Sequence, residues 1–327
     1  MFHRIFILIW FLDWLNNMID EPQRRSDWTA LKSIFNSAFF CSLGFFVVSF
    51  LIPIIAYGYM SATATEVALI FSLLTLGVIL FSPLAGKIAK RGRRRQSITI
   101  GAFARAVAYI GMALSVFYGD KYFLMLNSLV WGLGAAFYKV GSDAEISERV
   151  MPKDRAEAFG QREAANGRGS VIGAFLGFGI LLNWNNYPLN IITVFVMFAI
   201  ANLIGGLIVI RHRPELEQSW DNLIGTNAKS IIGLSIVALV LAAAIDTFIT
   251  SLLSPFVELY ILEYFTQDVM TVALIYLPGG IVTGMLGGRM GRFAGHRNKI
   301  AIVSMAVLVG SFSTLGIVFL PSVLEEP

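Results

Sequence analysis

Nine long apolar runs constrain the fold of this chain more than any other feature of its sequence. A helix needs about 20 predominantly apolar residues to cross the hydrocarbon core of a bilayer, and a helix satisfies its backbone hydrogen bonds within the segment. The sequence therefore predicts an all-α polytopic membrane protein. The predicted spans are roughly Leu31–Tyr57, Thr65–Pro83, Ile98–Phe117, Tyr122–Gly141, Ala158–Leu182, Leu189–Ile210, Ile231–Leu259, Val269–Leu286 and Lys299–Leu320.

Composition supports this prediction and limits the chemistry. Only 14% of the residues are charged, against about 25% in a typical soluble protein. The single cysteine, Cys41, allows neither an intrachain disulfide nor a cysteine-based zinc site. The three histidines lie far apart in the sequence, and no nucleotide-binding loop of the Gly-x4-Gly-Lys-Ser/Thr type is present. We therefore expect no metal, no cofactor and no enzymatic activity.

Charge in the loops predicts the orientation. The segment Gly86–Arg95 holds six basic residues, and Arg211–Ser230 and Arg289–Lys299 are also basic, whereas Gly58–Ala64 and Asn183–Pro188 carry no charge. Basic loops stay on the cytoplasmic side of a membrane. The expected location is thus the plasma or inner membrane of the cell, with the N-terminus in the cytoplasm. Basic residues confined to short loops indicate lipid, and not nucleic acid, as the partner.

The first 30 residues precede the first predicted span. Met1–Asp20 contains a short apolar run followed by Asp13 and two asparagines. That run is too short to span a bilayer, which favours an amphipathic segment on the inner membrane surface. The alternative is an upstream extension with no role.

The chain repeats itself in parallel. Gly86 and Gly288, each at the end of a predicted span, lie 202 residues apart, and the same offset relates Pro53 to Pro255. Parallel repeats occur in transporters whose halves are related by an axis along the membrane normal. The predicted domains are a six-helix bundle (31–211), an interdomain loop (212–230) and a three-helix segment (231–327).

In this repeat, the last three spans of the first half have no counterparts in the second half. We therefore expect an incomplete second bundle. We also expect the chain alone to be inactive, or to need a partner chain that supplies the missing helices.

The loop Gly-Lys-Ile-Ala-Lys-Arg-Gly-Arg-Arg-Arg at Gly86–Arg95 resembles the signature loop of the major facilitator superfamily. That signature reads Gly, three residues, Asp, Arg, one residue, Gly and two basic residues. Here Lys90 replaces the acid and Gly92 comes one residue early. The second copy, beginning at Gly288, keeps the spacing and has Arg292 at the acidic position. The resemblance covers about Leu31 to Leu320.

This resemblance implies a major facilitator fold: a six-helix bundle followed by the first helices of a second one. It also implies either a cytoplasmic latch between the halves or loops that only set the topology. The departures at Lys90 and Arg292 remove the usual acidic partner of that latch. The candidate gate residues are Gly86, Lys90, Arg91, Gly92, Arg93, Gly288, Arg292, Gly295 and Arg297.

Two series of glycines recur every four residues on predicted helices. One consists of Gly169, Gly173 and Gly177, and the other contains Gly280 and Gly284. Small residues at this spacing let helices approach closely in a membrane. In the family resembled, the fifth and eighth helices meet between the halves, so the two series are candidates to face each other. Separate packing against other neighbours is the alternative.

Charged residues at membrane depth are candidates for function because they are costly to insert. Asp246 lies near the middle of the seventh span, where it could bind a cation, take up a proton, or form a structural hydrogen bond. Arg168 is a second candidate. Lys139 and Asp143 are four residues apart and are predicted to pair.

Aromatic residues offer a cavity lining, with Trp131 and Tyr138 as the candidates beside Lys139. Plain packing is the alternative for such aromatic residues. Arg105 and Arg162 are placed near span ends, where long side chains can extend toward the membrane surface. Ser128 occupies the position at which many proton-coupled exporters of the superfamily have an arginine.

Taken together, the sequence predicts a secondary transporter of a small solute, driven by a proton or ion gradient or by the solute gradient. The alternative is a non-transporting membrane subunit or sensor that reuses the fold. Asp246→Asn discriminates the two, since only a transporter would lose or uncouple its transport.

Overall fold

The computed structural model describes residues 27–181 apart from 91, residues 187–211 and residues 269–295. Within these ranges the chain forms α-helices and one short π-helical turn, with no strand. Four of the described helices (α4, α5, α6 and α8) are long and apolar enough to cross a membrane, judged by length and composition. The predicted all-α architecture is confirmed. Several features discussed above lie outside the described residues: Met1–Asp20, Arg91, residues 212–230, Asp246, Pro255, Arg297 and Lys299–Leu320.

The predicted first span is divided into three pieces, which corrects the expectation of one continuous helix. They are α2 (Trp28–Ser42), α3 (Phe45–Ile54) and the π-helical turn η1 (Ile55–Tyr59). The break comes at Gly44, where an added Cβ would lie 2.6 Å from the Phe198 ring. Pro53 lies inside α3, just before the π-helical turn. A proline removes one helical hydrogen bond and crowds the preceding turn, which accounts for the altered helix geometry that follows it.

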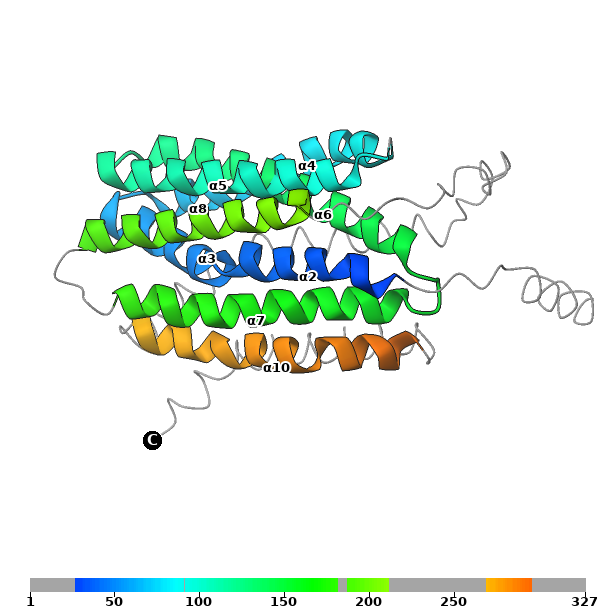
Figure 1. Ribbon diagram of the computed structural model, residues 1–327. Coiled ribbons are helices and arrows are strands. Elements are labelled where there is room, and N and C mark those ends of the chain that lie inside the picture. The colour runs from blue at the N-terminus through cyan, green and yellow to red at the C-terminus, as the bar shows by residue number, and fades with distance from the viewer. Residues whose placement is uncertain (1–26, 91, 182–186, 212–268, 296–327) are drawn as a thin grey trace, which may run out of the picture.

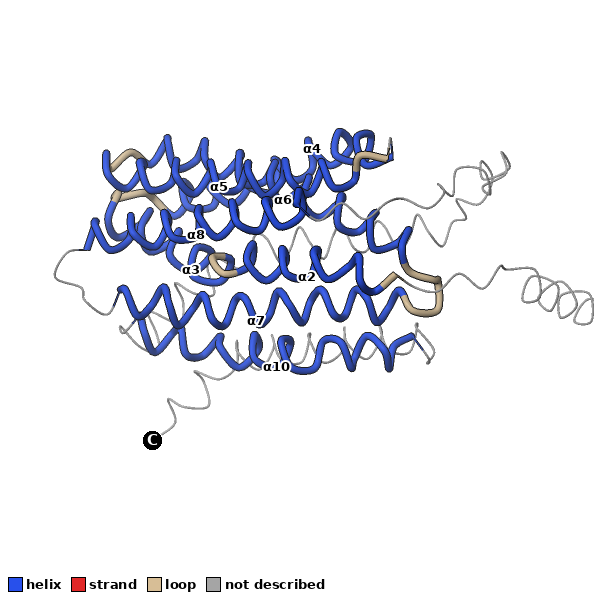
Figure 2. The backbone as a smooth tube through the Cα atoms, viewed as in Figure 1, coloured by secondary structure: helices blue, strands red, loops and turns tan. Residues whose placement is uncertain are grey.

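The other predicted spans within the described ranges are each part of a single helix. These are α4 (Ala64–Lys90), α5 (Arg94–Tyr118), α6 (Lys121–Arg149), α7 (Arg155–Leu181), α8 (Tyr187–Arg211) and α10 (Val269–Gly295). The helices run alongside one another as one elongated bundle (Figure 1). Short connections join α5 to α6 and α6 to α7 (Figure 2).

Local sequence sets the helix ends. Thr63 and Glu66 form a capping box: Glu66 Oε2 accepts from the Thr63 backbone N–H at 2.7 Å, and Thr63 Oγ1 accepts from the Glu66 N–H at 3.3 Å. Gly119 ends α5 in the left-handed conformation (φ 66°), which glycine adopts without steric cost. Asp120 then caps α6 by accepting from Tyr122 N and Phe123 N.

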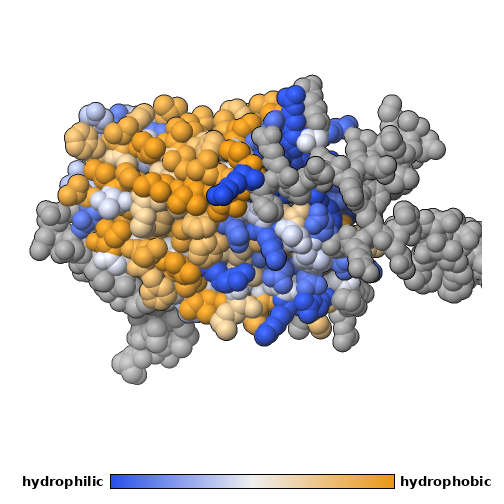
Figure 3. Space-filling view, viewed as in Figure 1, coloured by the Kyte–Doolittle hydropathy of each residue, from blue (hydrophilic) through white to orange (hydrophobic). Residues whose placement is uncertain are grey.

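Polar residues concentrate at one end of the bundle. Here α4 ends at Lys90, α5 begins at Arg94 and α6 ends at Arg149. We call this the basic end. In Figure 3 a broad hydrophobic surface covers the rest of the visible face, and hydrophilic side chains gather at the basic end. This distribution agrees with a bilayer-embedded bundle whose charged loops lie on one side.

Glycines bring α4, α5 and α6 into close contact. A Cβ added at Gly77 of α4 would lie 2.5 Å from the Leu129 carbonyl oxygen of α6, and one at Gly101 of α5 would lie 2.3 Å from Tyr138 N. Close backbone approach of this kind replaces hydrophobic burial as the packing force within a membrane. The three helices therefore form the tight side of the bundle, and α8 packs on α5 and α2.

The glycine series of α7 is placed differently from its prediction. Cβ atoms added at Gly169 and Gly173 would lie 2.2 Å and 1.6 Å from the carbonyl oxygens of Phe39 and Leu43, and Gly177 faces Val47. These glycines therefore receive α2 and α3, within the first bundle. α10 packs on a different face of α7. Residues two positions apart on a helix point in different directions, so the small residues of α7 can face two different neighbours.

Candidate functional site

A cavity of about 530 Å³ lies among α2, α3, α5, α6, α7 and α10. Its size is within the range of small-molecule sites. We call it the central cavity. Polar lining comes mainly from α6 and α7, and Gly280 and Thr283 of α10 close one side. The sequence-predicted residues Trp131, Tyr138 and Lys139 all line it.

Arg105 of α5 is the most unusual group in the cavity wall. It is 6% exposed and lies eleven residues from the start of α5, about 16 Å along the helix. Its Nη2 donates to the Cys41 carbonyl oxygen at 2.8 Å. The guanidinium lies over the rings of Trp131 and Tyr138, with its Cζ 5.0 Å and 5.7 Å from their centroids. Arg105 therefore does not extend toward the membrane surface, which corrects the prediction.

Two buried donors beside the cavity lack an acceptor within the described part of the chain. They are Arg105 Nε and Trp131 Nε1. Tyr138, in contrast, donates its hydroxyl to Ser37 Oγ at 3.2 Å. A buried donor without an acceptor is unfavourable, so a ligand whose acceptor reached these two groups would stabilise them.

The predicted Lys139–Asp143 pair is replaced by another. Asp143 pairs with Arg162 of α7, which also donates to Glu163 at 2.9 Å and to Ser142 Oγ at 3.2 Å. This network ties α6 to α7 beside the cavity. Lys139 is exposed and lines the cavity, and no ion pair to it is formed among the residues that the structure describes.

Arg168 lies at a second cavity of about 320 Å³, lined by residues of α2, α7 and α10. Its side chain is exposed, and its Nε donates to the Ala164 carbonyl oxygen one turn earlier at 3.1 Å. The structure thus separates Arg168 from Trp131, Tyr138 and Lys139.

Contact between α7 and α10 joins the two halves of the repeat. A Cβ added at Gly160 would lie 2.4 Å from Gly287 O, one at Gly167 would lie 2.6 Å from Gly284 N, and one at Gly291 would lie 2.3 Å from Ala156 O. Gly280 faces Val171, and Gly288 faces Gln161. From Gly284 to Gly291 the interface is therefore largely backbone against backbone, and Figure 1 shows α7 and α10 side by side.

Comparison with protein families settles the relationship that this geometry suggests. A sequence model of the Major Facilitator Superfamily matches residues 34–325. The chain belongs to the Major Facilitator Superfamily. It is therefore a multi-pass membrane protein of a transporter family whose members sit in the bilayer and bind small-molecule solutes. A search of curated proteins finds no match.

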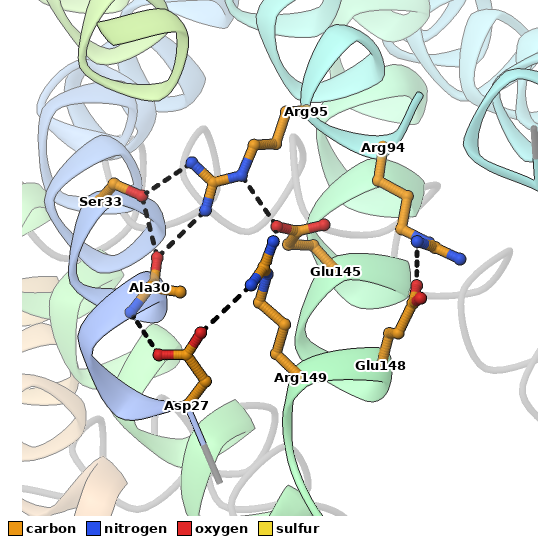
Figure 4. Close-up of polar contacts among 8 residues, drawn as sticks. All are labelled: Asp27, Ala30, Ser33, Arg94, Arg95, Glu145, Glu148 and Arg149. Atoms are coloured by element: carbon orange, nitrogen blue, oxygen red, sulfur yellow. Dashed lines mark hydrogen bonds and ion pairs between the residues drawn. The ribbon is translucent and has the colours of Figure 1, made fainter. Parts of the chain in front are cut away.

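The superfamily signature loop leads into a polar network at the basic end. Figure 4 shows Arg95 pointing to Glu145 and Ser33, and Arg149 pointing to Glu145 and Asp27. Glu145 Oε1 accepts from Arg95 Nε at 2.8 Å and from Arg149 Nε at 2.7 Å. These contacts connect the starts of α2 and α5 with the end of α6. On the other side of α6, Arg94 pairs with Glu148.

The candidate gate residues that the structure describes lie toward the same end. Gly92 adopts a left-handed conformation (φ 74°) in the turn before α5, with Arg93 exposed beside it. Gly86 lies near the end of α4 and Lys90 at its last position, and Gly295 ends α10. Arg292 of α10 pairs with Glu157 of α7. In this major facilitator protein, the arginine at the acidic position of the second signature-like loop therefore forms an ion pair between α7 and α10.

Sequence reasoning missed two groups at the cavity. Arg105 and Arg162 were placed near span ends because their helices extend further toward the basic end than the apolar runs do. For Arg162, the missed signal is pairing across helices, because Asp143 of α6 pairs with Arg162 of α7. For Arg105, the missed signal is the glycine at position 134 of α6, which lets α5 and α6 approach closely. A Cβ added there would lie 2.5 Å from Arg105 Cγ.

Proposed function

We propose that this chain is a secondary transporter that moves a small solute by alternating access around the central cavity. The observation that carries the proposal is the position of the cavity. Its walls come from α2, α3, α5, α6 and α7 of the first half and from α10 of the second half. A rocking motion of the halves would therefore open this cavity to either side of the membrane.

The contact between α7 and α10 suits such motion. Helices that meet through glycine backbones can slide over one another without disengaging large side chains, as in shear movements. Arg292 and Glu157 hold the same two helices at the basic end. The Arg292 side chain is 62% exposed, and solvent screens an ion pair at the surface so that it contributes little to stability. Such a pair is weak enough to break and re-form in each cycle.

The proposed orientation has the basic end in the cytoplasm of a cell-membrane protein. Support comes from the loop charges, because basic loops are retained on the cytoplasmic side. The gate proposed here consists of the signature loop at Gly86–Arg95 and the Arg292–Glu157 pair.

A cavity cysteine tests alternating access without a known substrate. In a Cys41→Ser background, Ser170→Cys places a thiol in the cavity wall. We expect it to react with a membrane-impermeant methanethiosulfonate added to either face, in right-side-out and inside-out vesicles. A thiol-independent cross-link from a benzophenone side chain placed at position 292 to the adjacent α7 should slow the reaction from the basic side by about 10-fold or more, because it holds the protein in one of its two states.

The control is the same cysteine without the cross-linker, which should retain both rates. Reaction from one side only, unaffected by cross-linking, would contradict the proposal. That result would favour a membrane subunit or sensor that does not transport.

Asp246 is the proposed coupling carboxylate, on the basis of its position in the seventh predicted span. If it takes up a proton during transport, Asp246→Asn should leave the protein folded and remove the pH dependence, between about 5 and 8, of the ratio of the cavity-cysteine rates from the two faces, in which the titration of the thiol itself cancels. Amide and carboxyl groups have similar size, but only the carboxyl titrates. An unchanged pH profile would exclude Asp246 from coupling.

A further inference from the structure

We infer that the central cavity selects an organic anion that has an apolar body. The inference names the substrate class of the proposed transporter and thus rests on the proposed function. Three observations carry it, all at residues that line one cavity: a buried arginine whose Nε–H has no acceptor among the described residues, a lysine without an ion pair to any of them, and an apolar aromatic wall.

Arg105 supplies the anchor. Its guanidinium carbon lies over the rings of Trp131 and Tyr138, where the attraction is to the π electrons. These rings do not accept its in-plane N–H groups. Apart from the Nη2 bond to Cys41 O, the edge of the group therefore has donors to offer, and Nε is buried without an acceptor in the residues described. The fork of a guanidinium matches a carboxylate or phosphate with two parallel hydrogen bonds.

Trp131 adds a neutral donor beside this anchor. It is 7% exposed, and its Nε1 also lacks an acceptor in the described ranges. An anion has only acceptor sites, whereas a cation such as an ammonium has only donors. A cation would leave both buried donors unpaired and would face Arg105 at short range. The donor pattern thus favours an anion over a cation.

The acidic groups near the cavity are already engaged. Glu163 lines the cavity, and Asp143 lies behind it, and both carboxylates pair with Arg162. Glu163 also accepts from Asn166 Nδ2 at 3.1 Å. Lys139 extends from the same helix as Trp131, eight residues further, about 12 Å along the axis. Its ammonium therefore adds a positive potential at the cavity without a neutralising carboxylate in the described part of the chain.

An apolar body fits the remaining wall. The Phe45 ring is tilted against Trp131, with centroids 6.1 Å apart, and half of Phe45 is exposed although it lines the cavity. Ala135 and Gly280 add small apolar surface. Ligand sites combine such apolar walls with few polar groups that fix orientation. The class that fits is a carboxylate with an aromatic or aliphatic body.

Matched probes test the charge preference. The full chain in lipid nanodiscs is titrated with benzoate, benzamide and benzylamine, and with 4-phenylbutyrate, 4-phenylbutyramide and 4-phenylbutylamine, by calorimetry. We expect the carboxylate of at least one set to bind about 10-fold or more tightly than its amide and amine, because hydrogen bonds to charged groups are the strong ones. Preference for an amine or amide, or no binding of either carboxylate, overturns the inference.

Substitutions locate the site. Arg105→Gln should weaken carboxylate binding by about 10-fold or more, and Arg105→Lys should restore part of it. Lys139→Gln should weaken it by a smaller factor, and this exposed residue can be changed without affecting the fold. Arg155→Gln and Lys153→Gln remove the same charges from exposed positions at the basic end and should bind carboxylates like the unmodified chain. Equal losses in the control variants would show a general charge effect and overturn the assignment.

The two proposals fail separately. If the cavity cysteine reacts from both faces but the protein prefers amines, the anion site is contradicted and the transport proposal stands. If carboxylate binding depends on Arg105 but the cavity cysteine reacts from one face only, the anion site stands and the transport proposal is contradicted.

Discussion

Replacing Glu145 by glutamine is expected to lower the free energy of unfolding by about 3–5 kcal/mol. Glu145 is 3% exposed, and a single carboxylate oxygen accepts from both Arg95 and Arg149. An amide in its place removes the carboxylate that the largely buried Arg95 and Arg149 share, and leaves the more exposed Asp27, at 3.2 Å, as the carboxylate beside Arg149. Removing one member of a buried ionic network is more costly than its net contribution suggests, because the remaining charges stay desolvated.

The measurement is equilibrium unfolding in mixed micelles, followed by circular dichroism. Glu66→Gln is the matched control, since Glu66 pairs with Lys121 at 2.7 Å in a more exposed position at the other end of the bundle. Glutamine can also keep the capping box with Thr63. Its expected cost is much smaller than that of Glu145→Gln, because solvent screens an exposed ion pair. Equal losses in the two variants would contradict the central role assigned to Glu145.

Replacing Gly173 by alanine is expected to destabilise the protein by about 2 kcal/mol or more. The new Cβ would lie 1.6 Å from the Leu43 carbonyl oxygen. The obstacle is backbone, so no side-chain rotation can relieve it, and α7 must move away from the junction of α2 and α3. Since α10 packs on another face of α7, that displacement also reaches the contact between the two halves.

Gly179 provides a control on the same helix. A Cβ there would meet nothing within 4 Å, so Gly179→Ala should be neutral or stabilising by up to about 1 kcal/mol, because alanine favours the helix. Thermal unfolding of both variants in detergent gives the comparison. A Gly173→Ala protein as stable as Gly179→Ala would show that α7 is not confined against α2 and α3.

Helix identity was predictable because apolar run length follows directly from bilayer thickness. Within the described ranges, each predicted span lies in helical structure. The break at Gly44 was not predictable, since it arises where Phe198 of α8 meets this backbone. The helix ends were also extended, because α5 and α7 begin with charged residues that continue the helix beyond the apolar run toward the basic end.

The candidate site was predicted in part. Trp131, Tyr138 and Lys139 are at the central cavity, whereas Arg168 lies at another. Helical spacing indicates which residues share a face, but it does not indicate which neighbouring helix that face meets. For that reason Asp143 pairs with Arg162 across helices and not with Lys139 one turn away.

The long apolar runs in the sequence determined that this chain is a helical membrane protein, because backbone N–H and C=O groups in lipid must form their hydrogen bonds within the protein. Its signature-like loops indicated the superfamily. Only the tertiary structure decided that Arg105, near the middle of α5, lies over two aromatic rings beside a cavity that α10 helps to line. The reason is physical: the environment of a charge in a membrane depends on the helices packed around it, and that packing is set by contacts between residues distant in the sequence.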